Sequence, residues 1–287
     1  MKQYLLTFYH RRPRLALMVA AALCVAAFGT IIFGAHDAFA LKITMKRVIF
    51  EGTKRAEVLT LINNTADEMA FRIGWRNMRM GDKGLQEIPE GEDLGNVKPL
   101  DKMVVFAPRR VVIAPGGSQQ IRLMLRKPKD LAEGEYRSHL WVRPEAEAAK
   151  FDPNPVEGGK SAVQIKMLAG VSVPVFIRHG QMTATAKLEN AALKSAGGKQ
   201  EISFDLLRQG NRSIYGDLDF ICTSGAEEKV LRQVRGIAIY TDVEKRSLKY
   251  DFPAGSACSA MRVVYTADKD DPLFKGNVIA QTTAAAR

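Results

Sequence analysis

Hydrophobic and polar residues alternate along most of this chain, as they do in β-strands that have one buried face and one solvated face. The clearest segment covers residues 69–76, and two more cover residues 121–126 and 136–143. Runs rich in Gly, Pro, Asn and Asp, which are typical of turns, separate such segments, for example at residues 115–117. No long amphipathic helix pattern interrupts them. The pattern therefore predicts an all-β protein.

Seven such segments lie in the first part of the chain, and seven short strands with regular turns are typical of an immunoglobulin-like β-sandwich. The predicted strands cover about residues 42–50, 55–63, 69–77, 103–113, 118–126, 135–143 and 163–178. Trp75, on the third strand, is expected to anchor the core. Residues 41–179 contain no cysteine, so they cannot form the disulfide that joins the two sheets of antibody domains.

A second all-β domain is predicted after a very short link at residues 178–180. Its strands cover residues 182–188, 202–207, 214–222, 234–240, 247–252 and 261–265. The Ala-rich tail after Phe274 is expected to be frayed. The chain is therefore predicted to divide into a leader (1–40) and two immunoglobulin-like domains (41–179 and 180–287).

The leader has three parts. Basic residues near the N-terminus are followed by an apolar stretch from Leu15 to Gly34 and by Ala38-Phe39-Ala40. These parts, in this order, are those of a secretory signal peptide, and cleavage after Ala40 would leave 247 residues, which is 287 less 40. The alternative is a retained membrane anchor, since the apolar stretch is about long enough to span a bilayer.

Composition and charge exclude several classes of protein. With 46% hydrophobic and 25% charged residues, the chain is neither disordered overall nor a multi-span membrane protein. Its formal net charge of +11 falls to +8 without the leader, which carries four basic residues and one acidic residue. Export, together with the lack of a basic run with interleaved aromatic residues, argues against nucleic acid as a partner.

Cys222 and Cys258 are the cysteines that remain after the leader is removed. An even pair in an oxidising compartment predicts a disulfide, and two buried thiols are the alternative. His139 and His179 are the remaining histidines, and a serine or cysteine nucleophile would need one of them as its base. His139 stands on the solvent-facing side of its predicted strand, and His179 lies at the link.

No cluster of His, Cys, Asp or Glu in the sequence has the spacing of metal ligands. We therefore predict no catalytic residue, no metal and no cofactor, and the protein is not expected to be an enzyme. A hydrolase that depends on His139 or His179 is the competing hypothesis.

The segment from Val163 to Ile177 is about fifteen residues long, where a typical strand has five or six. Its apolar residues on one face are Val163, Ile165, Met167, Val171, Val173 and Val175. Pro174 cannot donate to a ladder, which suits an edge position. A strand of this length would overhang its own sandwich and add to a partner's sheet. The alternative is a last strand that is buried in its own core.

Several short motifs resemble those of the PapD-like family of periplasmic pilus-assembly chaperones. They are Arg47–Gly52 (RVIFEG), Phe71 with Trp75 (FRIGW), Ala107-Pro108, Ile113–Gly116 (IAPG), Gly134–Leu140 (GEYRSHL), Val173–Arg178 (VPVFIR) and Gly210–Asp217 (GNRSIYGD). Their order and spacing, rather than any one motif, carry the resemblance. It covers both predicted domains and is densest in residues 45–178.

The resemblance implies two immunoglobulin-like domains in an L shape, with a cleft between them. Such chaperones lend their long G strand to an incomplete pilin subunit and hold the subunit's C-terminal carboxylate on two basic residues in the cleft. The first of these corresponds to Arg47. The second would stand where this chain has Pro174, so Lys166 and Arg178 are the candidates in its place. This departure is closer to the less typical branches of the family.

The function predicted on this basis is that of a periplasmic chaperone that captures pilin subunits and delivers them for pilus assembly. The side chains expected to enter the subunit's groove are Val163, Ile165, Met167, Val171 and Val173, on the strand at about 163–177. Pilin subunits and an outer-membrane usher are the expected partners, and the free protein could self-associate through the same edge. The alternative is a two-domain immunoglobulin-like envelope protein that binds carbohydrate or another protein without strand donation.

Overall fold

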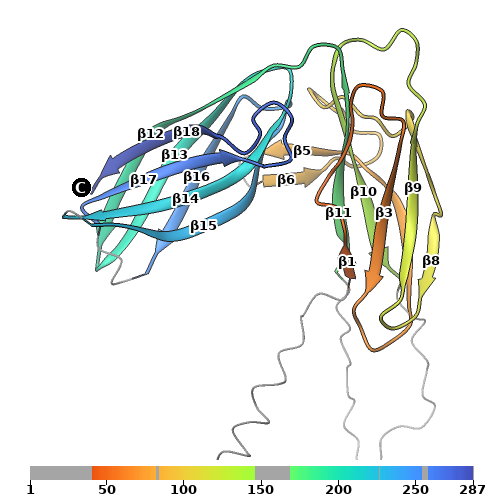
Figure 1. Cartoon of the computed structure of the whole chain (residues 1–287), viewed down its shortest axis with the longest axis horizontal. Helices are drawn as coiled ribbons and strands as arrows, with labels where there is room; N and C mark the ends of the chain where they lie inside the picture. The colour runs from red at the N-terminus through yellow and green to blue at the C-terminus, as the bar shows by residue number, and fades with distance from the viewer. Residues whose placement is uncertain (1–40, 82–83, 146–168, 226, 254–257, 287) are drawn as a thin grey trace, which may run out of the picture. The chain divides into compact units, whose positions relative to one another are not determined.

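The structure is a computed structural model that describes residues 41–81, 84–145, 169–225, 227–253 and 258–286. These residues form strands, turns and loops, with no helix among them. Accordingly, the described part of the chain has no helix that could cross a membrane. The predicted leader lies outside the described residues. The strands build two immunoglobulin-like β-sandwiches, as the alternation predicts (Figure 1).

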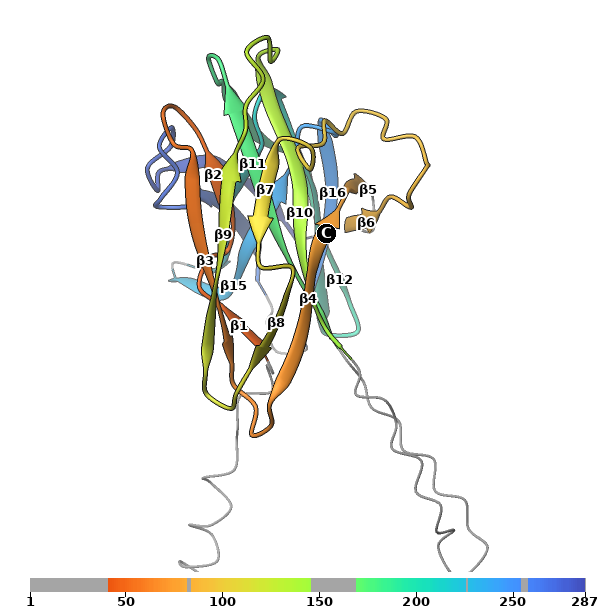
Figure 2. The same ribbon diagram turned by 90° about the vertical axis from the view of Figure 1, so that its right-hand side faces the viewer.

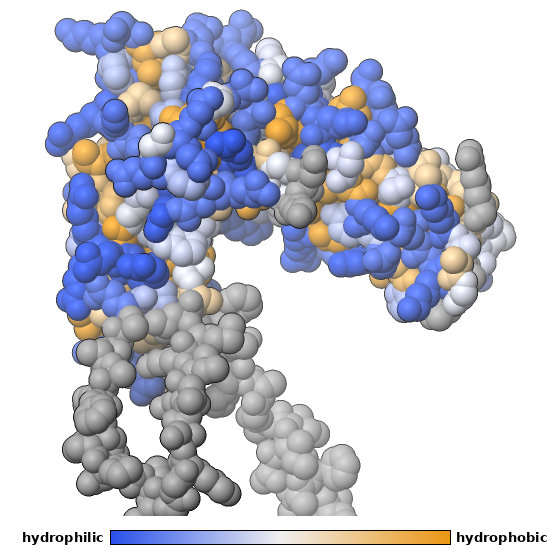
Figure 3. All heavy atoms as spheres, turned by 180° about the vertical axis from the view of Figure 1, so that it is seen from behind, coloured by the Kyte–Doolittle hydropathy of each residue, from blue (hydrophilic) through white to orange (hydrophobic). Residues whose placement is uncertain are grey.

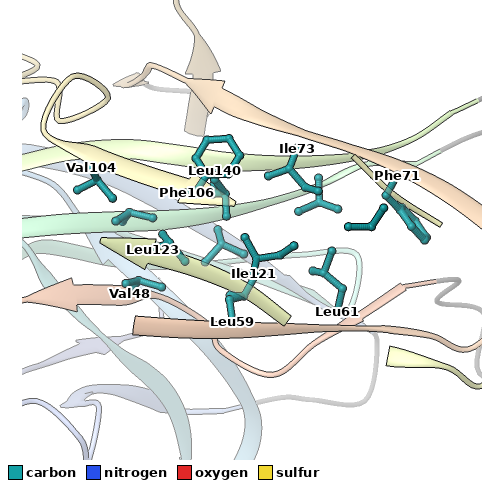
Figure 4. Close-up of a cluster of buried hydrophobic side chains, with 14 of the residues drawn as sticks. Val48, Leu59, Leu61, Phe71, Ile73, Val104, Phe106, Ile121, Leu123 and Leu140 are labelled. Carbon is teal, nitrogen blue, oxygen red and sulfur yellow. The ribbon is translucent and has the colours of Figure 1, made fainter. Parts of the chain in front are cut away.

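The first sandwich consists of two sheets (Figure 2). One has the strand order β1 (Leu41–Ile43), β3 (Ala56–Asn63), β9 (Ser118–Leu125), β7 (Val104–Ala107). The other has the order β2 (Val48–Phe50), β11 (Val171–His179), β10 (Gly134–Pro144), β4 (Met69–Arg76), β8 (Arg110–Ile113). Apolar side chains from both sheets fill the space between them, including Leu59, Leu61, Phe71, Ile73, Ile121, Leu123 and Leu140 (Figure 4). Trp75 packs edge-on against Phe106 beside this core, with 5.4 Å between the ring centres.

Two segments that the alternation predicts as single strands are each divided between the sheets. Residues 42–50 contain β1 in one sheet and β2 in the other, and residues 103–113 contain β7 and β8. In the second case Pro108, which has no N–H to donate to a ladder, directly follows β7. Because both sheets bury their side chains in the same core, a crossing from one sheet to the other leaves no mark in the hydrophobic pattern.

The second sandwich also has two sheets. Their strand orders are β12 (Ala184–Ala196), β13 (Lys199–Gly210), β16 (Lys245–Phe252) and β15 (Glu227–Ile239), β14 (Ile214–Ser224), β17 (Ala260–Ala267), β18 (Val278–Ala285). Aromatic side chains make up much of its core, and the ring centres of Phe220 and Tyr250 are 4.8 Å apart. A disulfide joins Cys222, on β14, to Cys258, which lies just before β17.

The tail after Phe274, expected to be frayed, instead contains a strand of the second sandwich. β18 pairs antiparallel with β17, and Ala284 is 5% exposed. The sequence of β18 is VIAQTTAA, in which Ala and Thr occupy both faces of the second half, so the pattern gives little sign of a buried face. The prediction of a frayed tail was therefore wrong.

Candidate functional site

β11 is the strand that the sequence singles out for binding, and one part of its main chain is open. β10 pairs with it from Val171 to His179. β2 pairs with it only at residues 175–177. Among the described residues, the stretch 171–174 therefore has a neighbouring strand on one side only. Its other side presents main-chain groups that can accept a further strand.

The side chains of β11 that face inward fill the core of the first sandwich. Val173, Val175 and Ile177 are 2%, 0% and 1% exposed, and Val171 packs against the margin of the same core. The core of its own domain therefore covers Val173, which corrects the prediction that this residue enters a partner's groove. Val171 is half-buried at the margin of that core, and its entry into a groove stays a prediction. The remaining predicted groove residues, Val163, Ile165 and Met167, and the candidate anchor Lys166 lie outside the described residues.

The other face of β11 is also covered. Phe176 packs with Met80, Ala238 and Tyr240 in a small apolar cluster that includes residues of the second sandwich. The ring centres of Phe176 and Tyr240 are 5.9 Å apart. At this end both faces of the sheet are therefore buried, which explains why residues 175–178 are buried without interruption.

His139, on β10, lies in this covered region and is 1% exposed. The prediction that it faces solvent was wrong: its side of the strand does point away from the first core, but Tyr240 lies against it, with the ring centres 6.2 Å apart. Burial, and to a lesser extent the charge of Arg137, lower the pKa of His139 to about 3, against the opposing effect of Asp242. Neither ring nitrogen has a hydrogen-bond partner in the described part of the chain.

A buried ion pair lies beside His139. Arg137 Nη1 is 3.1 Å from Asp242 Oδ1, and both side chains are 5% exposed. Asp242 also accepts a hydrogen bond from the main-chain N–H of Met80, at 2.6 Å. Met80 belongs to a hairpin that the alternation does not predict, β5 (Met78–Gly81) and β6 (Gly84–Glu87). The hairpin therefore helps to fasten the first sandwich to the loop after β15.

Arg178, a candidate for the second anchor, is part of another buried network. Its Nε donates to Glu135 at 2.9 Å, its Nη1 lies 3.5 Å from a carboxylate oxygen of Glu51, and its side chain is 2% exposed. Glu135 also accepts hydrogen bonds from the main-chain N–H and the hydroxyl of Ser213, in the second sandwich. Arg178 is thus hydrogen-bonded to Glu135 and ion-paired with Glu51, while its buried Nη1 makes no hydrogen bond in the described part of the chain. At 2% exposure, its side chain is not open to a ligand.

Arg47, the predicted carboxylate anchor, immediately precedes β2 and is held more loosely. Its guanidinium carbon lies 4.2 Å from the centre of the Tyr215 ring. Its Nη2 is 3.4 Å from Asp268 Oδ1, and its side chain is 11% exposed. Within the described part of the chain, this ion pair is the one polar contact of the Arg47 side chain, which donates no hydrogen bond there. Its N–H groups therefore keep most of their capacity for another acceptor.

A cavity of about 510 Å³ adjoins Arg47. Its charged lining residues are Lys46, Arg47, Glu51, Lys54, Asp268 and Asp270. The segment before β2 supplies Lys46 and Arg47, and the segment after β2 supplies Glu51 and Lys54. The loop between β17 and β18 supplies Asp268 and Asp270. Among the described residues no group of His, Cys, Asp or Glu has the arrangement of a metal site. The cavity therefore offers a ligand basic and acidic side chains in equal number, rather than a metal site.

Sequence reasoning singled out Arg47 but did not indicate which residues contact it. Tyr215, which contacts Arg47, and Ser213, which contacts Glu135, both belong to the motif Gly210–Asp217. The motif itself does not indicate either contact. Asp242 and Asp268 carry no signal in the sequence, because hydrophobic periodicity does not reveal which loops of two domains meet.

Exposed apolar residues do not gather into a broad surface on the face of the molecule shown in Figure 3, where they lie in small groups among hydrophilic residues. The most exposed large ones in the described part, at 44% to 56%, are Val112, Met124, Val230, Leu273 and Val278. They come from separate elements. The open edge of β11 and the cavity beside Arg47 are thus the two features that invite a functional interpretation.

No protein-family model matches this chain, and no curated protein matches it. Solved structures do match. The E. coli chaperone DraB is 15% identical over 87% of this chain and 97% of its own, with a TM-score of 0.42. The Pseudomonas aeruginosa CupB2 chaperone is 11% identical over 86% and 100%, with a TM-score of 0.43. A chain of the CsuC–CsuE chaperone–tip adhesion subunit complex, from archaic chaperone-usher Csu pili of Acinetobacter baumannii, is 10% identical over 73% and 90%, with a TM-score of 0.42.

Proposed function

We propose that this protein is a periplasmic chaperone that captures pilin subunits by strand addition at β11 and delivers them for pilus assembly. The observation that carries the proposal is the open main-chain edge at residues 171–174. An exposed edge invites aggregation, and proteins usually protect it. Strand addition is a use for such an edge, because main-chain hydrogen bonds bind a partner without requiring one particular partner sequence.

The sequence that precedes β11 supports this proposal. Val163, Ile165 and Met167 continue the apolar positions of the strand, separated by polar Gln164 and Lys166. The inward-facing residues that the structure describes reach the margin of their own core at Val171. Apolar residues farther along the same line would therefore be available to a groove in another protein. Each side chain that becomes fully buried there would contribute about 1.5–3 kcal/mol, before the cost of association.

Arg47 is the second part of the proposal, as the holder of the subunit's C-terminal carboxylate. It lines the cavity, stacks on Tyr215 and keeps its N–H donors available. A positioned guanidinium binds a carboxylate through charge-assisted hydrogen bonds. Arg178 is left out of this role because its own network engages it, and Lys166 stays a prediction for a second anchor.

The proposal includes a location and further partners. The leader predicts export with cleavage after Ala40, and the disulfide between Cys222 and Cys258 suits an oxidising compartment such as the periplasm. An outer-membrane usher would receive the captured subunits. In the absence of a subunit, two copies of the chain could pair through the open edge of β11.

Lysine at Ile165 and Met167 tests the proposal. Two charged side chains cannot be buried in an apolar groove without a large loss of solvation. We therefore expect I165K/M167K to reduce the amount of pilin that co-purifies with the protein by at least tenfold. The measurement is co-expression with candidate pilins, followed by purification on a tag carried by this protein.

The double variant A162K/Q164K is the matched control, because it adds the same charge to the opposite face of the same segment. It should capture pilin at close to the wild-type level. Equal capture by all three proteins would refute strand donation. It would favour an envelope protein that binds its partner through another surface.

A further inference from the structure

Asp268 is a carboxylate that the second sandwich holds in a fixed place. Its main-chain N–H donates to the carbonyl of Tyr215, at 3.1 Å, and its own carbonyl accepts from Asp271. Its Oδ1 accepts the main-chain N–H of Asp270, at 3.0 Å. Asp271 is itself buried against Arg212 and accepts the N–H groups of the next turn. The loop therefore presents the Asp268 carboxylate without needing Arg47 to position it.

Asp268 and Arg47 form a weaker contact than the bidentate pair that a carboxylate and a guanidinium can form. They share one ion-pair distance of 3.4 Å, and the Arg47 guanidinium donates no hydrogen bond to the Asp268 carboxylate. Arg178, in contrast, donates to Glu135 at 2.9 Å and is 2% exposed. A single long contact at the edge of a cavity can be exchanged for a bidentate one, which is the stronger arrangement for a guanidinium and a carboxylate.

The charges that line the cavity balance one another. Lys46, Arg47 and Lys54 face Glu51, Asp268 and Asp270. An incoming carboxylate therefore finds no excess of positive charge in the lining, and Asp268 stands beside the guanidinium that would bind it. Removing this one negative charge would leave Arg47 unpaired and the lining with an excess of one positive charge.

We propose that Asp268 is an internal competitor for the carboxylate of the captured partner. It pairs with Arg47 in the free protein and gives up the guanidinium when a C-terminal carboxylate enters the cavity. This inference rests on the proposed function, and it adds that the chain limits its own affinity for the carboxylate. The same contact keeps Arg47 oriented on Tyr215 while the cavity has no ligand.

The test is D268N, in which the amide oxygen can still accept the N–H of Asp270 but the charge is gone. The probe is a fluorescent peptide of alternating valine and threonine with a free C-terminal carboxylate, compared with its C-terminally amidated twin. Binding is followed by fluorescence anisotropy on the full protein. We expect D268N to bind the free-acid peptide about tenfold more tightly than the wild type, and to bind the amide unchanged.

Two controls distinguish competition for the Arg47 guanidinium from a general effect of the cavity's net charge. D270N removes one negative charge from the same cavity at a residue that forms no ion pair with Arg47 in the described part of the chain, and it should change binding of the free acid less than twofold. In the background R47A, D268N should have no effect, because the competition acts through the guanidinium. A melting curve for each variant establishes that it is folded.

Three results would overturn the inference. They are weaker binding of the free acid by D268N, equal gains from D268N and D270N, and a gain that persists in R47A. Wild-type protein that binds acid and amide equally would instead contradict Arg47 as the anchor in the proposed function. If D268N then binds the free acid more tightly than the amide, Asp268 is a competitor that blocks Arg47 completely in the wild type. If D268N also binds the two peptides equally, the proposed role of Asp268 is refuted.

Discussion

Arg47 and Arg178 show how the surroundings of a single residue decide what it can do. Arg47 immediately precedes β2 and Arg178 lies on β11 of the same sheet, and both contact carboxylates of the same chain. Arg178 is almost fully buried in a hydrogen-bonded network, and stripping a partner from it would leave an uncompensated buried charge. Arg47 has one long ion pair and a stacking partner, so exchanging its carboxylate breaks one contact of 3.4 Å rather than a hydrogen bond. These surroundings favour Arg47 over Arg178 as the proposed anchor for a ligand, and they give Arg178 a role in fastening the two sandwiches.

His139 makes the stability of the fold depend on pH. In the unfolded chain a histidine has a pKa near 6.5, and burial lowers it to about 3 in the folded protein. The unfolded state therefore binds more protons between these values, so stability falls as the pH falls from about 6.5 toward 3. Between pH 7 and pH 4.5 this one group should remove about 2–3 kcal/mol of the free energy of unfolding.

The variant H139L tests this prediction by urea unfolding at both pH values. Leucine fills similar space beside Tyr240 and does not titrate, and it removes two ring nitrogens that have no hydrogen-bond partner in the described part. The loss of stability on acidification should be smaller in H139L than in the wild type by about 2–3 kcal/mol. Parallel losses in the two proteins would show that His139 is not the group responsible.

At the scale of elements, β11 serves two purposes along its length. Its C-terminal part, residues 175–177, lies between β10 and β2 and has both faces buried. Its N-terminal part, residues 171–174, has an inward core face but an open main-chain side. The fixed part thus holds the open part in place, so that a strand can add to the edge without disturbing the core.

The disulfide ties two elements of the second sandwich, β14 and the segment that leads into β17. The two cysteines are separated by 36 positions in the sequence. Loop-closure entropy predicts that such a cross-link stabilises the fold by about 3–4 kcal/mol, mainly by restricting the unfolded chain. We therefore expect C222A/C258A to unfold at lower urea concentration by an amount equivalent to this free energy.

A reducing agent provides the control for that prediction. Dithiothreitol should lower the stability of the wild type toward that of C222A/C258A and leave the double variant unchanged. A wild type that unfolds at the same urea concentration with and without reductant, while its thiols are shown to be released, would contradict the predicted stabilisation.

Much of the fold could be predicted from alternation, and the misses have physical causes. Alternation records that a side chain is buried, so it located most strands of both sandwiches. It could not show that residues 42–50 and 103–113 each cross between sheets that share one core. It also missed β18, where Ala and Thr provide little contrast, and it treated the outward face of β10 as solvated because the covering residue, Tyr240, is far away in sequence.

At the scale of the whole molecule, contacts between the two sandwiches join residues that are far apart in sequence. Arg137 contacts Asp242, Glu135 contacts Ser213, and Arg47 contacts Asp268. Arg47 could be found from the sequence through a family resemblance, whereas its acidic partner could not, because no local pattern specifies which loops meet. The carboxylate chemistry of the cavity is therefore a property of the assembled pair of domains.

The central claim is that a partner adds a strand at the open edge of β11. Hydrogen exchange of backbone amides, measured for the free protein and for its complex with the pilin that co-purifies with it, tests this most directly. We predict that exchange slows in residues 163–174 on binding and stays unchanged at residues 175–177, whose main chain already has a strand on both sides. Unchanged exchange at 163–174 in a stable complex would contradict strand addition at this edge.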